Sequence, residues 1–190
     1  MPRRSIGVLA GAFNPVTRAH LALVEAAQEL VEEVLCVVPR AYPHKTFEGA
    51  AFDDRIRMLE AASGAYQVRV TSGGLFIEIA RELRADSPDA DIHFLCGSDA
   101  AERILTWDYG EPGIAERMLD EFGLLVAARQ GEFDPPAHLR ERVRALELRG
   151  DFDDVSSTEV RRRIAAGESW EHLVPPGIIE IAREIYSVPD

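Results

Sequence analysis

The sequence predicts an α/β fold in which a doubly wound parallel sheet carries helices on both faces. Short apolar runs alternate along the chain with longer segments of helical periodicity, and turn residues separate the two. The runs are rich in Val, Ile and Leu without strict polar alternation, which is typical of strands buried on both faces. We expect roughly five or six strands. One domain over residues 1–190 is long enough to build its own core.

Composition narrows the possible partners. A formal net charge of -12 disfavours a nucleic-acid partner, because a phosphate backbone requires a broad basic face. Cys36 and Cys96 each lie within an apolar run, which indicates buried thiols in a reducing compartment rather than a disulfide or a zinc site. No stretch reaches the ~20 apolar residues of a membrane span. Residues 1–13 lack a convincing signal-peptide cleavage site, so we expect a cytoplasmic protein without a membrane partner.

The first strand, turn and helix carry the most informative pattern. Ser5 to Ala10 is predicted to be a buried strand, and Gly11 with Asn14-Pro15 supplies the turn that ends it. Thr17 is the predicted N-cap of a helix that runs to about Glu32.

His20 would lie in the first turn of that helix, beside unpaired backbone N–H groups and the positive end of the helix dipole. A phosphate fits there, because a Gly turn also permits close backbone approach. A plain strand–turn–helix with Thr17 as the cap and His20 in solvent is equally compatible with this stretch alone. The glycine spacing excludes the dinucleotide fingerprint, and the sequence contains no P-loop motif.

The remaining elements follow in alternating order. Further strands are predicted at Val34–Val38, Gln67–Thr71, Ile92–Cys96 and within Glu121–Arg129. Helices are predicted at Asp53–Ser63 and Leu75–Arg84, after Gly97-Ser98-Asp99 in a segment that contains Trp107, from Ser156 and at Pro176–Tyr186. His138–Leu146 is predicted to be an exposed helix with ion pairs.

The segment G-A-F-N-P-V-T-R-A-H at residues 11–20 resembles the first signature of the nucleotidyltransferase superfamily, with Thr17-Arg18-Ala19-His20 as its (H/T)-x-x-H core. The flanking residues are most similar to the nicotinamide or nicotinate mononucleotide adenylyltransferases. The resemblance implies a Rossmann-like sheet of the nucleotidyltransferase type. It also implies adenylyl transfer from ATP to a pyridine mononucleotide, with release of pyrophosphate.

A second signature lies at V-S-S-T-E-V-R-R-R, residues 155–163. Ser156 and Glu159 satisfy a capping box, and a well-capped helix is the simple interpretation. The stretch is also similar to the superfamily pattern I-S-S-T-x-(I/V)-R, in which hydroxyls, helix-start amides and an arginine bind the ATP triphosphate. The tail Leu173-Val174-Pro175 is likewise common in pyridine mononucleotide adenylyltransferases.

Two segments between the signatures fit the same family. The loop P-x-x-x-P-H-K ends at Lys45 and precedes Arg55 in R-x-x-M-L, as in the bacterial nicotinate branch, where the lysine reaches substrate phosphate. Two simpler interpretations remain open, namely that Lys45 lies in a solvated loop and that Arg55 forms a surface salt bridge. Gly97-Ser98-Asp99 followed by Trp107 resembles G-x-D-x7-W, which implies that Asp99 contacts nucleotide hydroxyls and that Trp107 stacks on a base. A core or rim aromatic remains the alternative interpretation of Trp107.

One segment departs from the family. The bacterial branch commonly has S-Y-T-x-D-T-L where this chain has Ser72-Gly73-Gly74-Leu75-Phe76-Ile77-Glu78. The usual segment helps to hold the pyridine base, so the departure leaves the choice between nicotinate and nicotinamide open.

The resemblance implies the following roles. The implied catalytic residues are His20, Thr17 and Lys45. The implied ATP-binding residues are Gly11, Ala12, Phe13, His20, Gly97, Asp99, Ser156, Ser157, Thr158 and Arg161. The implied acceptor-binding residues are Asn14, Lys45, Arg55 and Trp107. The acceptor phosphate is already ionised at neutral pH and needs no general base, so positioning and charge neutralisation remain for the protein. Mg²⁺ is expected on the phosphates, without an assigned protein ligand.

Three alternatives remain open. Pantetheine phosphate adenylyltransferase shares the first signature, although the P-H-K loop and the L-V-P tail argue against it. A cytidylyltransferase is the second. A non-catalytic nucleotide-binding module on the same fold is the third, because fold alone does not define activity. The expected partners are ATP and a pyridine mononucleotide, and a homo-oligomer is possible.

Overall fold

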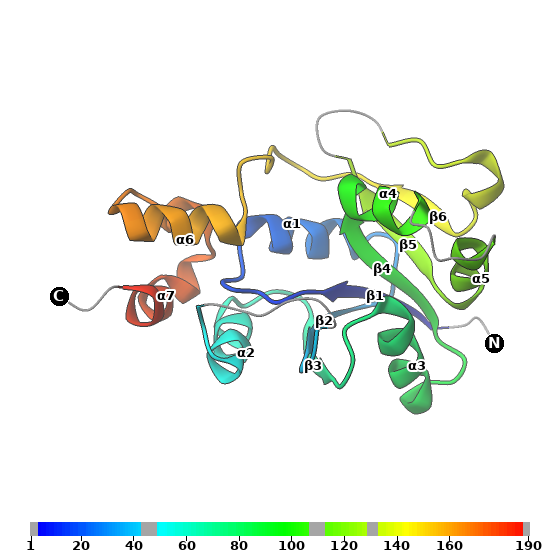
Figure 1. The fold of residues 1–190 in the computed structure, drawn as a ribbon, viewed down its shortest axis with the longest axis horizontal. Coiled ribbons are helices and arrows are strands. Elements are labelled where there is room, and N and C mark those ends of the chain that lie inside the picture. Colours follow the sequence, from blue (N-terminus) through cyan, green and yellow to red (C-terminus); the bar gives the residue numbers. More distant parts are fainter. Residues whose placement is uncertain (1–3, 43–48, 107–112, 129–132, 188–190) are drawn as a thin grey trace.

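The computed structural model describes residues 4–42, 49–106, 113–128 and 133–187 (Figure 1). The strands are β1 (Ser5–Ala10), β2 (Glu33–Pro39), β3 (Gln67–Thr71), β4 (Asp91–Gly97), β5 (Gly123–Ala127) and β6 (Val143–Leu146). The helices are α1 (Arg18–Ala27), α2 (Phe52–Ala61), α3 (Phe76–Asp86), α4 (Ser98–Thr106), α5 (Ile114–Glu121), α6 (Ser157–Ala166) and α7 (Ile179–Tyr186). The short 3-10 turns are η1 (Ala137–Leu139), η2 (Glu171–Leu173) and η3 (Pro176–Ile178).

The six strands form one sheet in the order β3-β2-β1-β4-β5-β6, and every neighbouring pair is parallel. The chain therefore winds outward from β1 in one direction and returns to begin the other half at β4. This arrangement confirms the predicted doubly wound sheet. In such sheets ligands bind beyond the carboxyl ends of the strands, where the winding direction reverses.

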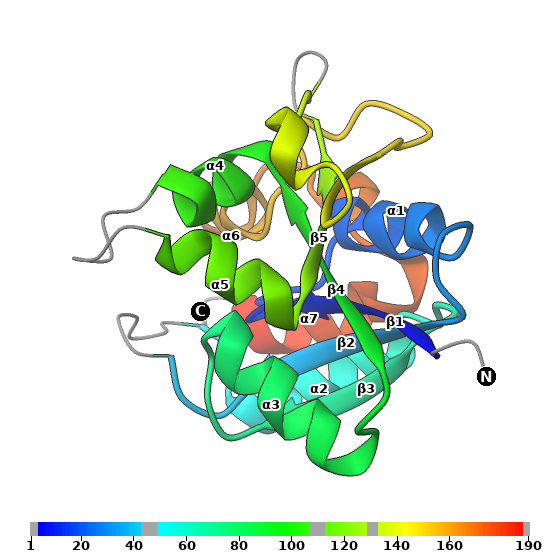
Figure 2. The same ribbon diagram turned by 90° about the vertical axis from the view of Figure 1, so that its right-hand side faces the viewer.

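Two hydrophobic layers sandwich the sheet. One packs side chains of α1, α2, α6 and α7 against strand residues such as Leu9 and Cys36. The other packs α3, α4 and α5 against residues such as Val8 and Val37 on the opposite face, and Figure 2 shows these three helices on one side of the strands. Neighbouring strand residues thus enter opposite layers, which is why the central strands are apolar without interruption.

Residues 138–146 differ from the prediction. We expected an exposed helix, but η1 covers only its start and Val143–Leu146 forms β6, which pairs with β5 from Leu124↔Val143 onward. Val143 and Leu146 are buried and Arg144 is exposed. The charged residues suggested a solvated helix, whereas burial of these two apolar residues beside β5 determines the structure.

Several boundaries also shift. The helix expected to reach Glu32 ends at Ala27, and the final helix begins with the turn η3 before α7. Cys36 and Cys96 are buried free thiols, and burial raises the pKa of each to about 12. None of the helices in the described ranges is long and apolar enough to cross a membrane.

Candidate active site

The loop after β1, Gly11–Pro15, lies at the carboxyl edge of the sheet. The backbone N–H of Gly11 donates to the carbonyl of Val37 at 3.1 Å and extends the pairing of β1 with β2. Phe13 then adopts a left-handed conformation with φ of 50°. For a residue other than glycine this conformation costs about 1–2 kcal/mol, so surrounding contacts must hold it.

Side chains from distant parts of the chain bind four carbonyl groups of this loop. The Tyr42 hydroxyl donates to the Gly11 carbonyl at 2.7 Å, and the buried Arg55 guanidinium donates to the Ala12 carbonyl at 3.2 Å. Arg161 donates to the Asn14 carbonyl, and the Ser157 hydroxyl donates to the Pro15 carbonyl at 2.7 Å.

Two backbone amides of the loop are not used by these contacts. The backbone N–H groups of Ala12 and Phe13 have no acceptor among the described residues. Successive backbone amides with their carbonyls turned away form an anion-binding concavity. The predicted phosphate contacts of Ala12 and Phe13 are compatible with this geometry, whereas the Gly11 N–H is already bound to the Val37 carbonyl. All three contacts stay predictions.

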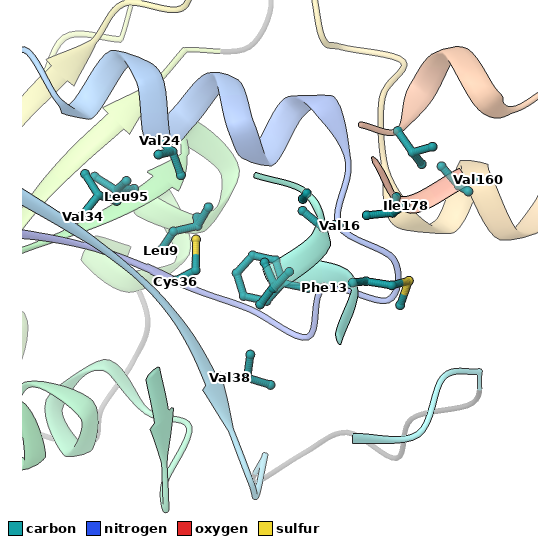
Figure 3. Packing of buried hydrophobic residues seen from close by; sticks show 14 of the residues in the cluster. Leu9, Phe13, Val16, Val24, Val34, Cys36, Val38, Leu95, Val160 and Ile178 are labelled. Carbon is teal, nitrogen blue, oxygen red and sulfur yellow. The ribbon is translucent and has the colours of Figure 1, made fainter. Parts of the chain in front are cut away.

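The hydrophobic layer under α1 supports the loop from below. Figure 3 shows Phe13 and Val16 pointing into the same cluster as Val160 of α6 and Ile178 of η3. All four side chains are buried. The loop is therefore fixed both by its carbonyl contacts and by its two apolar side chains.

Thr17 is the N-cap of α1, as predicted, with an extended backbone. Its backbone N–H donates to Nδ1 of His20 at 2.9 Å, and its hydroxyl oxygen lies 2.8 Å from the same nitrogen. Nδ1 therefore acts as the acceptor of the neutral ring, and the proton resides on Nε2. Nε2 has no partner among the described residues and is available as a hydrogen-bond donor.

The environment keeps His20 neutral. Desolvation lowers the pKa of His20 from 6.5 to about 4, although the side chain retains partial exposure. The Phe13 ring lies against it, with centroids 5.1 Å apart. In the free protein at neutral pH, His20 is thus a neutral hydrogen-bond donor at Nε2 rather than a cation, and its predicted contact with a phosphate oxygen stays a prediction.

The two signatures meet in space. Ser157 and Arg161 of α6 both bind the loop that follows β1, and α6 lies close to the start of α1 (Figure 1). The Ser156 side chain accepts the Glu159 backbone N–H at 3.1 Å, which confirms the predicted cap. Thr158 is exposed in the first turn of α6.

This docking adds to the roles expected of the second signature. The single hydroxyl proton of Ser157 is used by Pro15, whereas Arg161 has five donors and only part of its fork is needed for Asn14. Phosphate contacts by Ser156, Ser157, Thr158 and Arg161 stay predictions. The geometry gives Ser157 and Arg161 a second function in holding the first loop.

A cavity of about 830 Å³ opens beside α1 at the carboxyl ends of β4, β5 and β6. Gly97, Ala127 and Leu146, the last residues of those strands, form part of its wall. Among the described residues, four carboxylates line it and no lysine, arginine or histidine does. The carboxylates are Asp134, Glu147, Asp151 and Asp153. Carboxylates can accept hydrogen bonds from ribose hydroxyls and from a nucleobase amino group.

The other predicted positions differ in their fit. Gly97 lines the cavity, and Asp99 is exposed in the first turn of α4 just beyond it. Arg55 is 6% exposed and lies beneath the loop, so the alternative of a surface salt bridge is wrong. Asn14 is also buried, with its side-chain oxygen engaged inside the protein. Acceptor contacts by Arg55 and Asn14 stay predictions.

Lys45 and Trp107 lie outside the described residues, so their predicted roles are untested. The Ser72-Gly73-Gly74 segment is described and packs against the end of β2. A Cβ on Gly74 would lie 2.7 Å from the carbonyl oxygen of Ala41, so only glycine permits this approach.

Sequence reasoning missed Tyr42 and the segment 147–153 that lines the cavity. Tyr42 was in a loop already singled out, but its phenol carried no motif. Segment 147–153 had no repeat, motif or periodicity that points to a ligand.

The fold and the site define a nucleotidyltransferase, and the comparisons agree. A family model described as cytidylyltransferase-like matches residues 8–163. A "Probable nicotinate-nucleotide adenylyltransferase" of Gloeobacter violaceus is 31% identical over 204 residues, covering 97% of each chain. A relative with the same description from Solibacter usitatus is 31% identical over 94% of this chain and 96% of its own. The chain therefore belongs to the cytidylyltransferase-like family, in its nicotinate-nucleotide adenylyltransferase branch.

Solved structures agree on the fold. The nicotinic acid mononucleotide adenylyltransferase of Plasmodium falciparum complexed with NaAD superposes with a TM-score of 0.71, at 17% identity and 96% coverage of both chains. The same enzyme complexed with APC gives a TM-score of 0.68 at 17% identity, again with 96% coverage of both.

Proposed function

We propose that the protein transfers the adenylyl group of ATP to nicotinate mononucleotide, giving nicotinate adenine dinucleotide and pyrophosphate. An oxygen of the mononucleotide phosphate attacks the α-phosphorus of ATP, and a new P–O bond forms. The bond to the β-phosphate oxygen breaks, and pyrophosphate leaves with that electron pair. The described relatives carry this activity in their name.

One observation supports the proposal above the others: the anchored loop and the neutral His20 adjoin the cavity through α1. Ala19, next to His20 in the sequence, lines that cavity. ATP can place its base and ribose among the carboxylates and its phosphates against the loop amides, Nε2 of His20 and the start of α6. The α-phosphorus then lies near His20, which donates to the charge that develops on its oxygens.

Mg²⁺ would enter with the nucleotide. Among the described residues no cluster of three His, Cys, Asp or Glu side chains could hold a metal ion. Mg²⁺ binds phosphate oxygens and water more often than a dedicated protein cage, so we assign it no protein ligand. When bound, it would neutralise charge on the departing pyrophosphate.

The test measures pyrophosphate and dinucleotide from ATP, Mg²⁺ and one acceptor at a time. Nicotinate mononucleotide should give stoichiometric amounts of both products, and nicotinamide mononucleotide should react more slowly. Phosphopantetheine with ATP, and CTP in place of ATP, should give none. Absence of product with both mononucleotides would contradict the proposal, and product with phosphopantetheine alone would replace it.

A further inference from the structure

Tyr186, the last residue of α7, contacts the loop after β1. Its phenol donates to Oδ1 of Asn14 at 2.5 Å, across 172 residues of sequence. The backbone N–H of Ala50 donates to the same oxygen at 3.0 Å. Oδ1 therefore uses both of its acceptor sites inside the protein, which fixes the orientation of the Asn14 amide group.

The position of Tyr186 is set by close packing of the C-terminal elements on α2. Ala182 of α7 is fully buried. A Cβ on Gly177 in η3 would lie 2.3 Å from the carbonyl oxygen of Ala61, so the turn that leads into α7 rests directly on the end of α2. Arg57 and Glu184 add an exposed ion pair between the two helices, with N–O at 3.0 Å.

From Tyr186 a short series of direct contacts reaches His20. Asn14 follows Phe13, whose left-handed backbone must be held by its surroundings. The Phe13 ring lies against the His20 ring, and the carbonyl of Asn14 accepts from Arg161. A change in the position of Asn14 would therefore alter the contacts of both His20 and Arg161.

Tyr186 remains a donor throughout the working pH range. Burial raises the pKa of Tyr186 well above its ordinary 10, although the nearby Arg161 and Arg55 oppose that rise. The phenol therefore keeps its proton, and its hydrogen bond to Asn14 does not depend on pH near neutrality.

We propose that Tyr186 is a positioning residue for adenylyl transfer. Its hydrogen bond to Asn14 holds the loop after β1 so that His20 and Arg161 can contact the phosphates of the same nucleotide. This inference rests on the proposed function. Tyr186 lies outside both signatures and acts through Asn14, without touching the reacting atoms.

Tyr186→Phe removes the hydroxyl and keeps the ring. We expect kcat to fall about tenfold, with a smaller change in the KM of the acceptor, because preorganisation of the transition-state contacts is lost. The pKa of His20, followed by NMR in the free protein, should rise from about 4 toward 6.5 as its packing loosens.

Two controls separate positioning from stability. Tyr66→Phe removes a comparable bond, from a half-buried phenol to the carbonyl of Leu59 at 2.6 Å, away from the loop. It should leave kcat and the His20 titration unchanged. Glu184→Gln breaks the ion pair of α7 with Arg57 and leaves the phenol in place. Glu184→Gln should lose about as much thermal stability as Tyr186→Phe or less, and its kcat should stay at the wild-type value.

A Tyr186→Phe protein with wild-type kcat and an unchanged His20 titration would overturn the inference, whatever its melting temperature. Equal loss of kcat in Glu184→Gln would do the same. The His20 titration needs no substrate, so it tests whether Tyr186 influences His20 even if the wild-type protein makes no dinucleotide. A wild-type protein that makes no dinucleotide would contradict the proposed function, not the link between Tyr186 and His20.

Discussion

The hydroxyl of Ser157 lies 2.7 Å from the carbonyl oxygen of Pro15, although 142 residues separate them in the sequence. This contact joins the two signatures into one site. Residues expected to bind different phosphates of one nucleotide are thereby connected directly to each other. Mutations in either signature should therefore affect the other.

His20→Ala should lower turnover by roughly 10²- to 10³-fold, the usual effect of removing one donor to developing charge. Its folding should change little, because the ring is partly exposed. Steady-state rates and a thermal melt check both statements. His138→Ala, at an exposed position of η1, is the matched control and should behave as wild type. A near-normal rate for His20→Ala would remove this histidine from the mechanism.

Arg161→Ala should raise the KM for ATP, because it removes a cation from the start of α6 and a donor to the Asn14 carbonyl. Arg162→Ala changes the next residue, which is exposed and pairs with Glu159 and Glu168 instead. Its KM for ATP should stay at the wild-type value. If both variants show the same ATP dependence as the parent, Arg161 does not contact ATP, and the second signature acts only as a helix cap and as a support for the loop after β1.

Gly97→Val tests the cavity. A Cβ at this position meets no atom of the described residues within 4 Å, so we expect the larger side chain to enter the cavity and leave the fold intact. We expect the KM for ATP to rise about tenfold, the KM for the acceptor to remain unchanged and the melting temperature to stay near that of wild type. Gly97→Ala should have a smaller effect in the same direction. An unchanged KM for ATP would place the base elsewhere.

Acidification should destabilise the protein in part through His93. This residue is 5% exposed, donates from Nε2 to Asp91 at 3.0 Å and has no partner for Nδ1 in the described structure. Desolvation lowers the pKa of His93, with Arg144 and Arg142 adding to that effect and Asp91 opposing it. The unfolded chain binds the proton more readily, so this stability is complete above pH 6.5 and is lost as the pH falls below it.

Urea unfolding at pH 7.5 and pH 5.5 measures the effect. The free energy of unfolding should drop between these values in the wild type, and the drop should be smaller in His93→Gln. Because the lowered pKa of His20 acts in the same direction, His20→Ala is measured in parallel. An equal drop in wild type and His93→Gln would show that His93 does not contribute.

Local sequence patterns predicted much of the fold. The five predicted strands are present. Four of them are apolar runs typical of the interior of a parallel sheet, and Gln67–Thr71 alternates polar and apolar residues and forms an edge strand. Residues 143–146 were missed because a strand of four residues between charged neighbours has too short a pattern to separate from an exposed helix.

The site could be predicted only where a motif is local. Thr17, His20 and Ser156 occupy helix starts whose signals lie within a few residues, and the structure places them there. The bond of Tyr186 to Asn14 and that of Arg161 to the same loop depend on how distant helices pack. No periodicity or spacing encodes such contacts.

The carbonyl-anchored loop also orders events during synthesis on the ribosome. The loop is made among the first fifteen residues, but two of its carbonyl partners come from α6 and the contact to Asn14 comes from the end of α7. A nascent chain that lacks these helices can form β1, β2 and α1 without gaining a complete loop. The loop therefore reaches its anchored form only after the last helix has been made and has docked.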